Sequence, residues 1–266
     1  MKSRVLVVVL MFVLVMSLFT GCKSIEYPNV NFFGVADSFK SDGWRPFVMI
    51  KVYDTRLATI SFDAVNIDAT TSMFEAIKAG KDKDYNIDLA YANQLKLCAQ
   101  ALIEKQDPAA FVFDENGVTT QIKGVTVPVK EYFDLAKKAI AEGANNRAQF
   151  PNDQILTETA TAFDKDGWKR TMTIYAKGGI AIAANFDAIN KAGESRNKLN
   201  VDTDWIAQNK LIEDFFLFDK VNEQKFFSKL VTLLPDGTTG SIPGVTMKVK
   251  DIYDLVVKSI LSATLR

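Results

Sequence analysis

Histidine is absent from the 266-residue sequence. It is the usual general base and a common metal ligand, so its absence excludes every Ser-His and Cys-His catalytic arrangement. Neither charge is in excess, with 32 basic and 32 acidic side chains, and no basic field is available for nucleic acid. No Gly-x-Ser-x-Gly element and no Gly-Lys-Ser/Thr loop occurs. We therefore expect no independent catalytic activity, no catalytic residue, no metal site and no nucleic-acid partner.

Cysteine is scarce, with only Cys22 and Cys98 in the chain. Cys98 is spaced like Leu95 and Leu102 on one face of a helix, which predicts a buried core thiol and not a reactive one. If Cys22 carries a lipid, no intrachain disulfide can form.

The first 22 residues have the pattern of an export leader. Two basic residues precede an apolar run from Val5 to Phe19, which is shorter than the ~20 residues of a membrane-spanning helix. The run ends in Leu18-Phe19-Thr20-Gly21-Cys22, which resembles the lipobox of bacterial lipoproteins. The resemblance implies that residues 1–21 are a signal peptide and that Cys22 is acylated. An uncleaved anchor is the alternative, and both place the rest of the chain outside the cytoplasm, at a periplasmic or cell-surface membrane.

An internal repeat organises the remaining chain. Asp42-Gly43-Trp44 and Phe62-Asp63-Ala64 return 124 positions later as Asp166-Gly167-Trp168 and Phe186-Asp187-Ala188. We infer a tether over 22–38, a first module over 39–143, a linker over 144–159 and a second module over 160–266. Gly, Asn, Gln and Pro cluster at the junction, which predicts that the two modules fold separately.

Each module begins with strands and ends with helices. Strands are predicted at 47–53 and 57–62 in the first module and at 171–176 and 180–186 in the second, around short turns. Helices are predicted at 88–105 and 201–218, and one amphipathic helix closes each module. Strands followed by helices predict an α+β fold, with two homologous modules that each pack helices on an antiparallel sheet.

Three features leave alternatives open. Asp-Gly-Trp at 42–44 and 166–168 predicts a turn with a core tryptophan, or a ring that stacks on a flat ligand. In Phe62-Asp63 and Phe186-Asp187 the aspartates either cap the following turn or point at a site. The alternating acids of Asp82 to Asp88 favour a solvated loop over a calcium loop, because the required central glycine is missing.

A Gly-Val-Thr stretch precedes the last helix of each module, at Gly124 to Thr126 and at Gly244 to Thr246. Unpaired backbone N–H groups and the positive end of the helix dipole converge at a helix N-terminus, which favours an anion such as phosphate. An ordinary turn with an N-cap is the alternative.

These elements, in this order, resemble the FMN-binding domain in the flavin subunits of sodium-pumping NADH:quinone reductases and Rnf-type complexes. They are more similar still to its tandem form in lipoproteins that carry electrons outside the membrane. The resemblance covers roughly residues 39–141 and 163–260. It implies FMN as cofactor, flavin-based electron transfer as function, and redox proteins of the cell envelope as partners.

In that family, the threonine of a Ser-Gly-Ala-Thr motif is esterified to the FMN phosphate. The residues that match the motif here are Gly124, Thr126, Gly244 and Thr246. The family serine is replaced by Lys123 and Pro243, and the family aspartate falls at Thr120 and Gly240. We therefore expect FMN, where it is bound, to be held without a covalent bond, with Lys123 pairing with its phosphate. The alternative is a non-redox binding or structural lipoprotein that keeps the fold and has lost the flavin.

Overall fold

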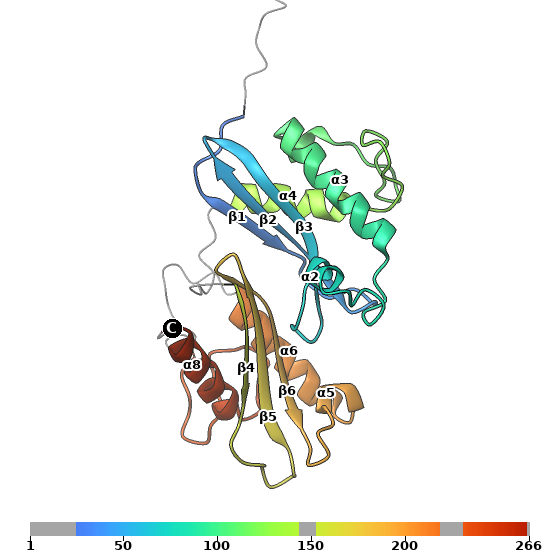
Figure 1. The fold of residues 1–266 in the computed structure, drawn as a ribbon. Coiled ribbons are helices and arrows are strands. Elements are labelled where there is room, and N and C mark those ends of the chain that lie inside the picture. Colours follow the sequence, from blue (N-terminus) through green and yellow to red (C-terminus); the bar gives the residue numbers. More distant parts are fainter. Residues whose placement is uncertain (1–24, 144–152, 219–230, 265–266) are drawn as a thin grey trace, which may run out of the picture.

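The computed structural model describes residues 25–143, 153–218 and 231–264. The predicted signal peptide, Cys22 and most of the predicted linker lie outside these ranges. The described residues form two modules, each with a three-stranded antiparallel sheet and packed helices (Figure 1). The predicted α+β fold is confirmed. Within the described ranges, none of the helices combines the length and the apolarity that a bilayer crossing requires.

In the first module, the strands of the sheet precede the long helices along the sequence. Its elements are β1 (Asn31–Val35), β2 (Trp44–Tyr53), β3 (Arg56–Asn66), α2 (Met73–Lys78), α3 (Leu89–Lys105), the 3-10 helix η1 (Pro108–Ala110) and α4 (Lys130–Glu142). The strand order is β1-β2-β3, with α3 packed on β3 and α4 packed on β1 and β2. Asp88 caps α3 by accepting hydrogen bonds from two backbone N–H groups of its first turn.

The second module repeats this order. Its elements are β4 (Gln154–Thr159), β5 (Lys169–Lys177), β6 (Ile180–Ile189), α5 (Arg196–Leu199), α6 (Thr203–Phe218) and α8 (Lys250–Thr264). The strand order is β4-β5-β6, with α6 packed on β6 and α8 packed on β4 and β5.

Both modules begin earlier than the sequence analysis places them. Strand β1 lies inside the predicted tether and pairs with β2, and β4 lies inside the predicted linker and pairs with β5. The sheets therefore start at Asn31 and Gln154. Gly34 lets α4 approach β1 closely, because a Cβ there would come within 2.7 Å of the Leu135 carbonyl oxygen.

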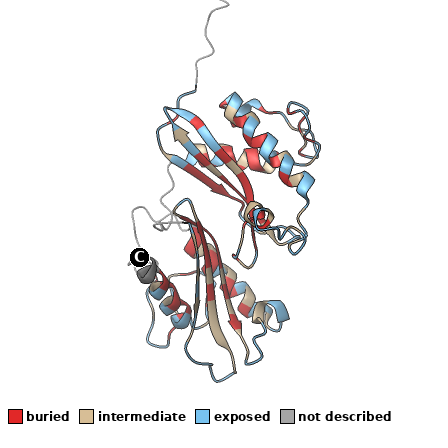
Figure 2. Cartoon of the chain, in the orientation of Figure 1, coloured by how far each residue is buried: buried red, intermediate tan, exposed pale blue. Residues whose placement is uncertain are grey.

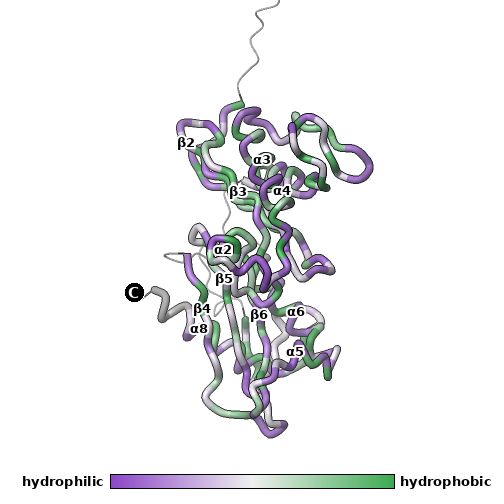
Figure 3. Tube along the Cα trace, turned by 45° about the vertical axis from the view of Figure 1, so that its right-hand side comes forward, coloured by the Kyte–Doolittle hydropathy of each residue, from purple (hydrophilic) through white to green (hydrophobic). Residues whose placement is uncertain are grey.

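Each module has its own hydrophobic core on the helix-covered face of its sheet (Figure 2). Cys98 is fully buried in the first core, which confirms the prediction of a core thiol. Phe62 and Phe186 occupy equivalent buried positions in the two cores. Figure 3 shows hydrophobic segments along the strands of both modules and hydrophilic segments in several connecting turns.

A third apolar cluster joins the two modules. It contains Phe33, Val35, Phe47, Val65 and Ala69 from the first module and Tyr175, Ile180, Ile182 and Ala183 from the second. Successive residues of a strand point to opposite faces, so Val48 packs toward the helices while Phe47 packs toward the other module. The sheet faces without helices thus bury each other, which argues against modules that fold separately.

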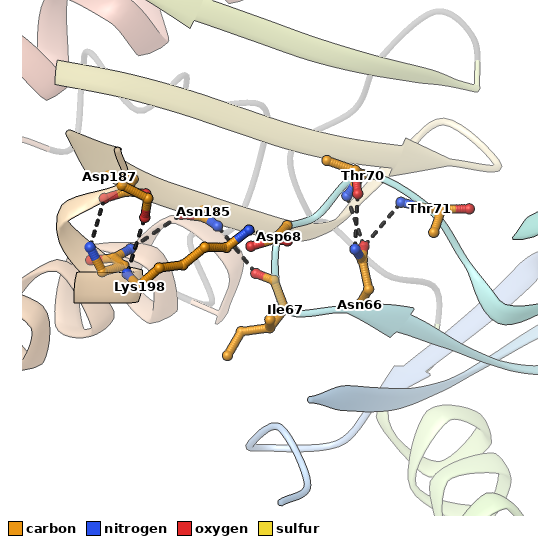
Figure 4. Close-up of polar contacts among 10 residues, drawn as sticks. Asn66, Ile67, Asp68, Thr70, Thr71, Asn185, Asp187 and Lys198 are labelled. Carbon is orange, nitrogen blue, oxygen red and sulfur yellow. Dashed lines mark hydrogen bonds and ion pairs between the residues drawn. The ribbon is translucent and has the colours of Figure 1, made fainter. Parts of the chain in front are cut away.

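Polar contacts shape the loop that follows β3 and link it to the second module (Figure 4). The Asn66 side chain accepts hydrogen bonds from the backbone N–H groups of Thr70 and Thr71, at 2.8 and 3.0 Å, and so shapes the loop between β3 and α2. Asp68 in this loop pairs with Lys198 of the second module at 3.1 Å. Asn185 donates to the Ile67 carbonyl oxygen at 3.3 Å.

Arg45 adds a buried cation to the interface between the modules. Its side chain is fully buried and donates to the carbonyl oxygens of Ala36 and Asp37, at 2.7 and 2.9 Å. Asp214 of the second module lies 3.8 Å away. Burial lowers the pKa of Arg45, and the Asp214 carboxylate opposes that effect.

Candidate functional site

The Gly-Val-Thr stretches form tight turns before the last helices. Helix α4 begins at Lys130 with Val129 as its N-cap, so Thr126 lies outside the first helical turn. Gly124 has a φ of 87° and Gly244 a φ of 81°. Side chains disfavour this backbone conformation, which explains why glycine stands at both positions. Residues 127–129 and 247–249 therefore separate the Gly-Val-Thr stretches from the helices, so the stretches precede the helices, as predicted, without forming their first turns.

The backbone N–H groups of these turns already have partners. Thr126 and Val127 donate to the Gln94 side-chain oxygen of α3, at 2.6 and 3.2 Å. In the second module, Gln208 of α6 accepts from Thr246 and Met247 at 2.7 and 2.8 Å. One glutamine therefore fixes each turn, and an anion at Thr126 or Thr246 has to displace it.

A cavity of about 220 Å³ opens in the first module. Its wall is made by residues at the start of β2, at the beginning of α2 and α3, and on α4, among them Lys40, Trp44, Pro46, Met73, Tyr91 and Tyr132. The half-buried Trp44 ring meets Tyr85 edge-on, with 6.1 Å between the ring centroids. Trp44 is thus a wall of this cavity, as the stacking alternative requires.

The two tyrosines of the cavity are held as neutral phenols. Tyr91 and Tyr132 are hydrogen-bonded to each other, and burial raises the pKa of both. Lys40 pairs with Glu131 at 2.5 Å, so its charge is balanced. The cavity therefore offers aromatic walls with polar groups, a chemistry suited to a flat ring with hydrogen-bonding edges.

The first turns of α3 connect the cavity with the Gly124 to Thr126 turn. Gln94, which holds the turn, follows Tyr91 by one turn of α3. Neither Lys123 nor Thr126 lines the cavity, and both are exposed. The predicted residues thus lie outside the aromatic cavity, and Trp44 is the lining residue that the sequence analysis considered for stacking.

Asp63 and Asp187 serve as caps. Asp63 accepts from the backbone N–H groups of Ala64 and Phe74, at 2.8 and 3.2 Å, at the start of α2. Burial raises the pKa of Asp63 to about 6. Asp187 accepts in the same way from Ala188 and Asn197. Both aspartates therefore cap the turn that follows them, which is one of the two alternatives from the sequence analysis.

The second module carries different side chains at the cavity position. Arg170 pairs with Ala188 as Pro46 pairs with Ala64, so Arg170 replaces Pro46. Arg196 follows the N-cap Ser195 as Met73 follows the N-cap Ser72, and so replaces Met73. Trp168 and Trp205 stand where the first module has Trp44 and Tyr91. Two guanidinium groups thus take the place of two apolar wall residues.

No protein-family profile matches the chain, and no curated protein matches it. A solution NMR structure of a Clostridium thermocellum protein is 29% identical, covers 44% of this chain and 95% of its own, and has a TM-score of 0.37. A crystal structure of a Clostridium perfringens protein is 20% identical, covers 44% of this chain and 88% of its own, and has a TM-score of 0.31. Both are structural-genomics targets, and each match spans less than half of this chain.

Proposed function

We propose that the protein is a lipid-anchored lipoprotein of the cell envelope whose first module binds the ring of FMN without a covalent bond and carries electrons. The observation behind this proposal is the cavity walled by Trp44, Tyr91 and Tyr132, whose helix α3 also carries Gln94, the residue bonded to the Gly124 to Thr126 turn. Bound FMN supplies one- or two-electron transfer, while the protein supplies the seat and the orientation.

The size of the cavity suits part of FMN. Pockets that enclose a drug-sized ligand measure ~300–1,000 Å³, whereas this cavity measures about 220 Å³. It accommodates a ring system, and the ribityl phosphate then extends along the surface toward the turn. An aromatic stacking pair contributes about 0.5–1.5 kcal/mol beyond buried area, so the ring provides much of the affinity.

The phosphate has to compete with Gln94. Charge-assisted hydrogen bonds are roughly twice as strong as neutral ones, so a phosphate oxygen replaces the Gln94 amide oxygen favourably at the N–H groups of Thr126 and Val127. The exposed Lys123 is the cation that we assign to the phosphate in this arrangement. Gly124 leaves the backbone accessible.

A second candidate is a non-redox binding lipoprotein that uses the same cavity for another ring-containing ligand. It is favoured by Gln94 and Gln208, which satisfy the turn amides without any ligand. The second module favours it as well, because arginines stand in place of two cavity residues there.

Titration of the full chain in detergent with FMN and with riboflavin, followed by flavin fluorescence, tests the proposal. We expect one FMN per chain, an affinity about tenfold weaker for Trp44→Leu, and no change for the matched Trp168→Leu. Gln94→Ala should strengthen FMN binding without affecting riboflavin, because it frees the turn amides for the phosphate. The mass of protein from its own host should show no flavin on Thr126 or Thr246. If folded protein leaves FMN fluorescence unchanged at high micromolar FMN, the second candidate stands.

A further inference from the structure

Two arginines of the second module converge on one tryptophan. The guanidinium carbons of Arg170 and Arg196 each lie 4.6 Å from the centre of the Trp205 ring. Arg196 also lies 5.3 Å from the centre of the Trp168 ring. Arg170 comes from β5, Arg196 from α5 and Trp205 from α6, and Trp168 directly precedes β5, so the fold assembles one cationic and aromatic cluster from separate parts of the chain.

Only part of the positive charge of this cluster is paired at short range, although Asp251, Asp164 and Asp187 lie near enough to raise the pKa of Arg170. Asp202 pairs with Arg196 at 2.8 Å, but no carboxylate among the described residues lies within 4 Å of the Arg170 guanidinium nitrogens. Burial, reinforced by the charge of Arg196, lowers the pKa of Arg170 to about 10. The nearby Asp187 is already committed to the Ser195 hydroxyl and to backbone N–H groups.

Three buried N–H donors of the cluster have no hydrogen-bond partner among the residues that the structure describes. They are Nη1 of Arg170, Nε of Arg196 and Nε1 of Trp205. Nη2 of Arg170 has only the Met247 sulfur, at 4.0 Å. Buried donors are normally satisfied, and charged ones are costly to leave unpaired. Donors from three neighbouring side chains of this cluster therefore lack an acceptor among the described residues.

The first module shows that the fold does not require these charges. Pro46 and Met73 occupy the equivalent positions there and line the cavity. Apolar residues would fill the space in the second module without burying a cation. The Arg196 side chain is 18% exposed, so this member of the cluster reaches solvent.

We propose that Arg170, Arg196, Trp168 and Trp205 form a binding site for a phosphate group in the second module. A guanidinium group presents a planar pair of donors that matches the oxygens of phosphate. The aromatic rings hold the guanidinium groups in position by cation–π contact. Phosphate supplies the missing acceptors and relieves the repulsion between the two cations.

The experiment uses the full chain in detergent, with inorganic phosphate as the probe at constant ionic strength. The chain has three tryptophans, so Trp44→Phe leaves a signal from Trp168 and Trp205 alone. We expect a saturable change in their fluorescence. Arg170→Gln should weaken phosphate binding at least about tenfold. Arg170→Lys keeps the charge but lacks the planar pair of donors, and it should weaken phosphate binding about threefold.

Lys169→Gln is the matched control. It removes the same charge from the adjacent strand residue, which lies over the Phe163 ring at 4.7 Å, and it should leave phosphate affinity within about twofold. Phosphate should raise the melting temperature of the Lys169→Gln variant and of the unmodified chain, but not that of Arg170→Gln. This second readout also monitors folding.

Glycerol phosphate and vesicles that contain phosphatidate then distinguish a soluble ester from a lipid head group as the source of the phosphate. Displacement of the probe by either supports the site. The proposal is overturned if folded protein shows no saturable response at tens of millimolar phosphate. It is equally overturned if Lys169→Gln and Arg170→Gln weaken binding to the same extent, since that result indicates unspecific attraction.

Discussion

Glu213 should make the protein less stable as the pH rises toward neutrality. Its carboxylate is buried on α6 and accepts a hydrogen bond from the Phe186 backbone N–H at 2.8 Å. Burial raises its pKa from 4.5 to about 7, although Lys210 and the Phe186 N–H favour the charged form. A folded pKa above the unfolded one means that the stabilising contribution is complete below about pH 4.5 and is lost as the pH rises through about 7.

The size of the effect follows from these two pKa values. One pKa unit corresponds to about 1.4 kcal/mol, so the change from 4.5 to about 7 amounts to about 3 kcal/mol of unfolding free energy. Glu213→Gln keeps an oxygen for the Phe186 N–H but does not ionise. The free energy of unfolding of this variant, minus that of the unmodified protein, should therefore rise by about 3 kcal/mol between about pH 4 and pH 8.

Urea unfolding at a series of pH values measures this difference. Glu104→Gln, at an exposed position of α3, is the matched control, and its difference from the unmodified protein should not change with pH in this way. A Glu213→Gln difference that stays constant from about pH 4 to pH 8 would refute the assignment of a buried, proton-binding carboxyl group.

Three further predictions concern other parts of the chain. Asp63→Asn should show the same trend at lower pH, with a stability advantage that develops between about pH 4 and pH 6 in urea titrations, because burial raises the pKa of Asp63 to about 6. Ile182→Ala should lower the free energy of unfolding by about 2–5 kcal/mol and leave a single calorimetric transition, because Ile182 belongs to the cluster between the modules. The control Ile155→Ala, at a 49% exposed position, should change the free energy of unfolding little. Two separate transitions in the unmodified protein would contradict the shared core. Cys22→Ala should release the protein from the membrane or leave its precursor uncleaved, and unchanged detergent partitioning and mass would contradict lipidation.

Much of the fold was predictable because the long elements have strong patterns. The hairpins around Asp54 and Gly178 and the helices α3 and α6 carry the periods expected for such elements, and the structure confirms them within a few residues. The short strands β1 and β4 were missed. The first is only five residues long and contains Gly34, and the second is six residues long and contains Glu158, so neither gives a strong strand signal on its own. Their pairing with β2 and β5 is a tertiary effect.

The candidate site was predictable only in part, because its decisive contacts link residues far apart in the sequence. Gln94 and Thr126 are 32 positions apart, and nothing local to either indicates the hydrogen bond between them. The repeat does contain one signal, since Gln94 and Gln208 each follow a helix-capping aspartate by the same spacing. Trp44, which the sequence analysis considered for stacking, lines the cavity, but the cavity also needs Tyr132 from α4.

The two modules place side chains of opposite character at the same position of one scaffold. A tryptophan that follows Asp-Gly stands in both, and an aromatic residue stands in the first turn of both long helices, so the aromatic frame is common. The difference lies in two positions on β2/β5 and α2/α5, which are apolar in the first module and arginine in the second. A site with apolar walls selects a neutral ring by burial, whereas paired guanidinium groups select an oxyanion by bidentate hydrogen bonds. Because the helix-free sheet faces are joined by one buried cluster, both positions are held within one packed structure, and a change that loosens this cluster affects both sites.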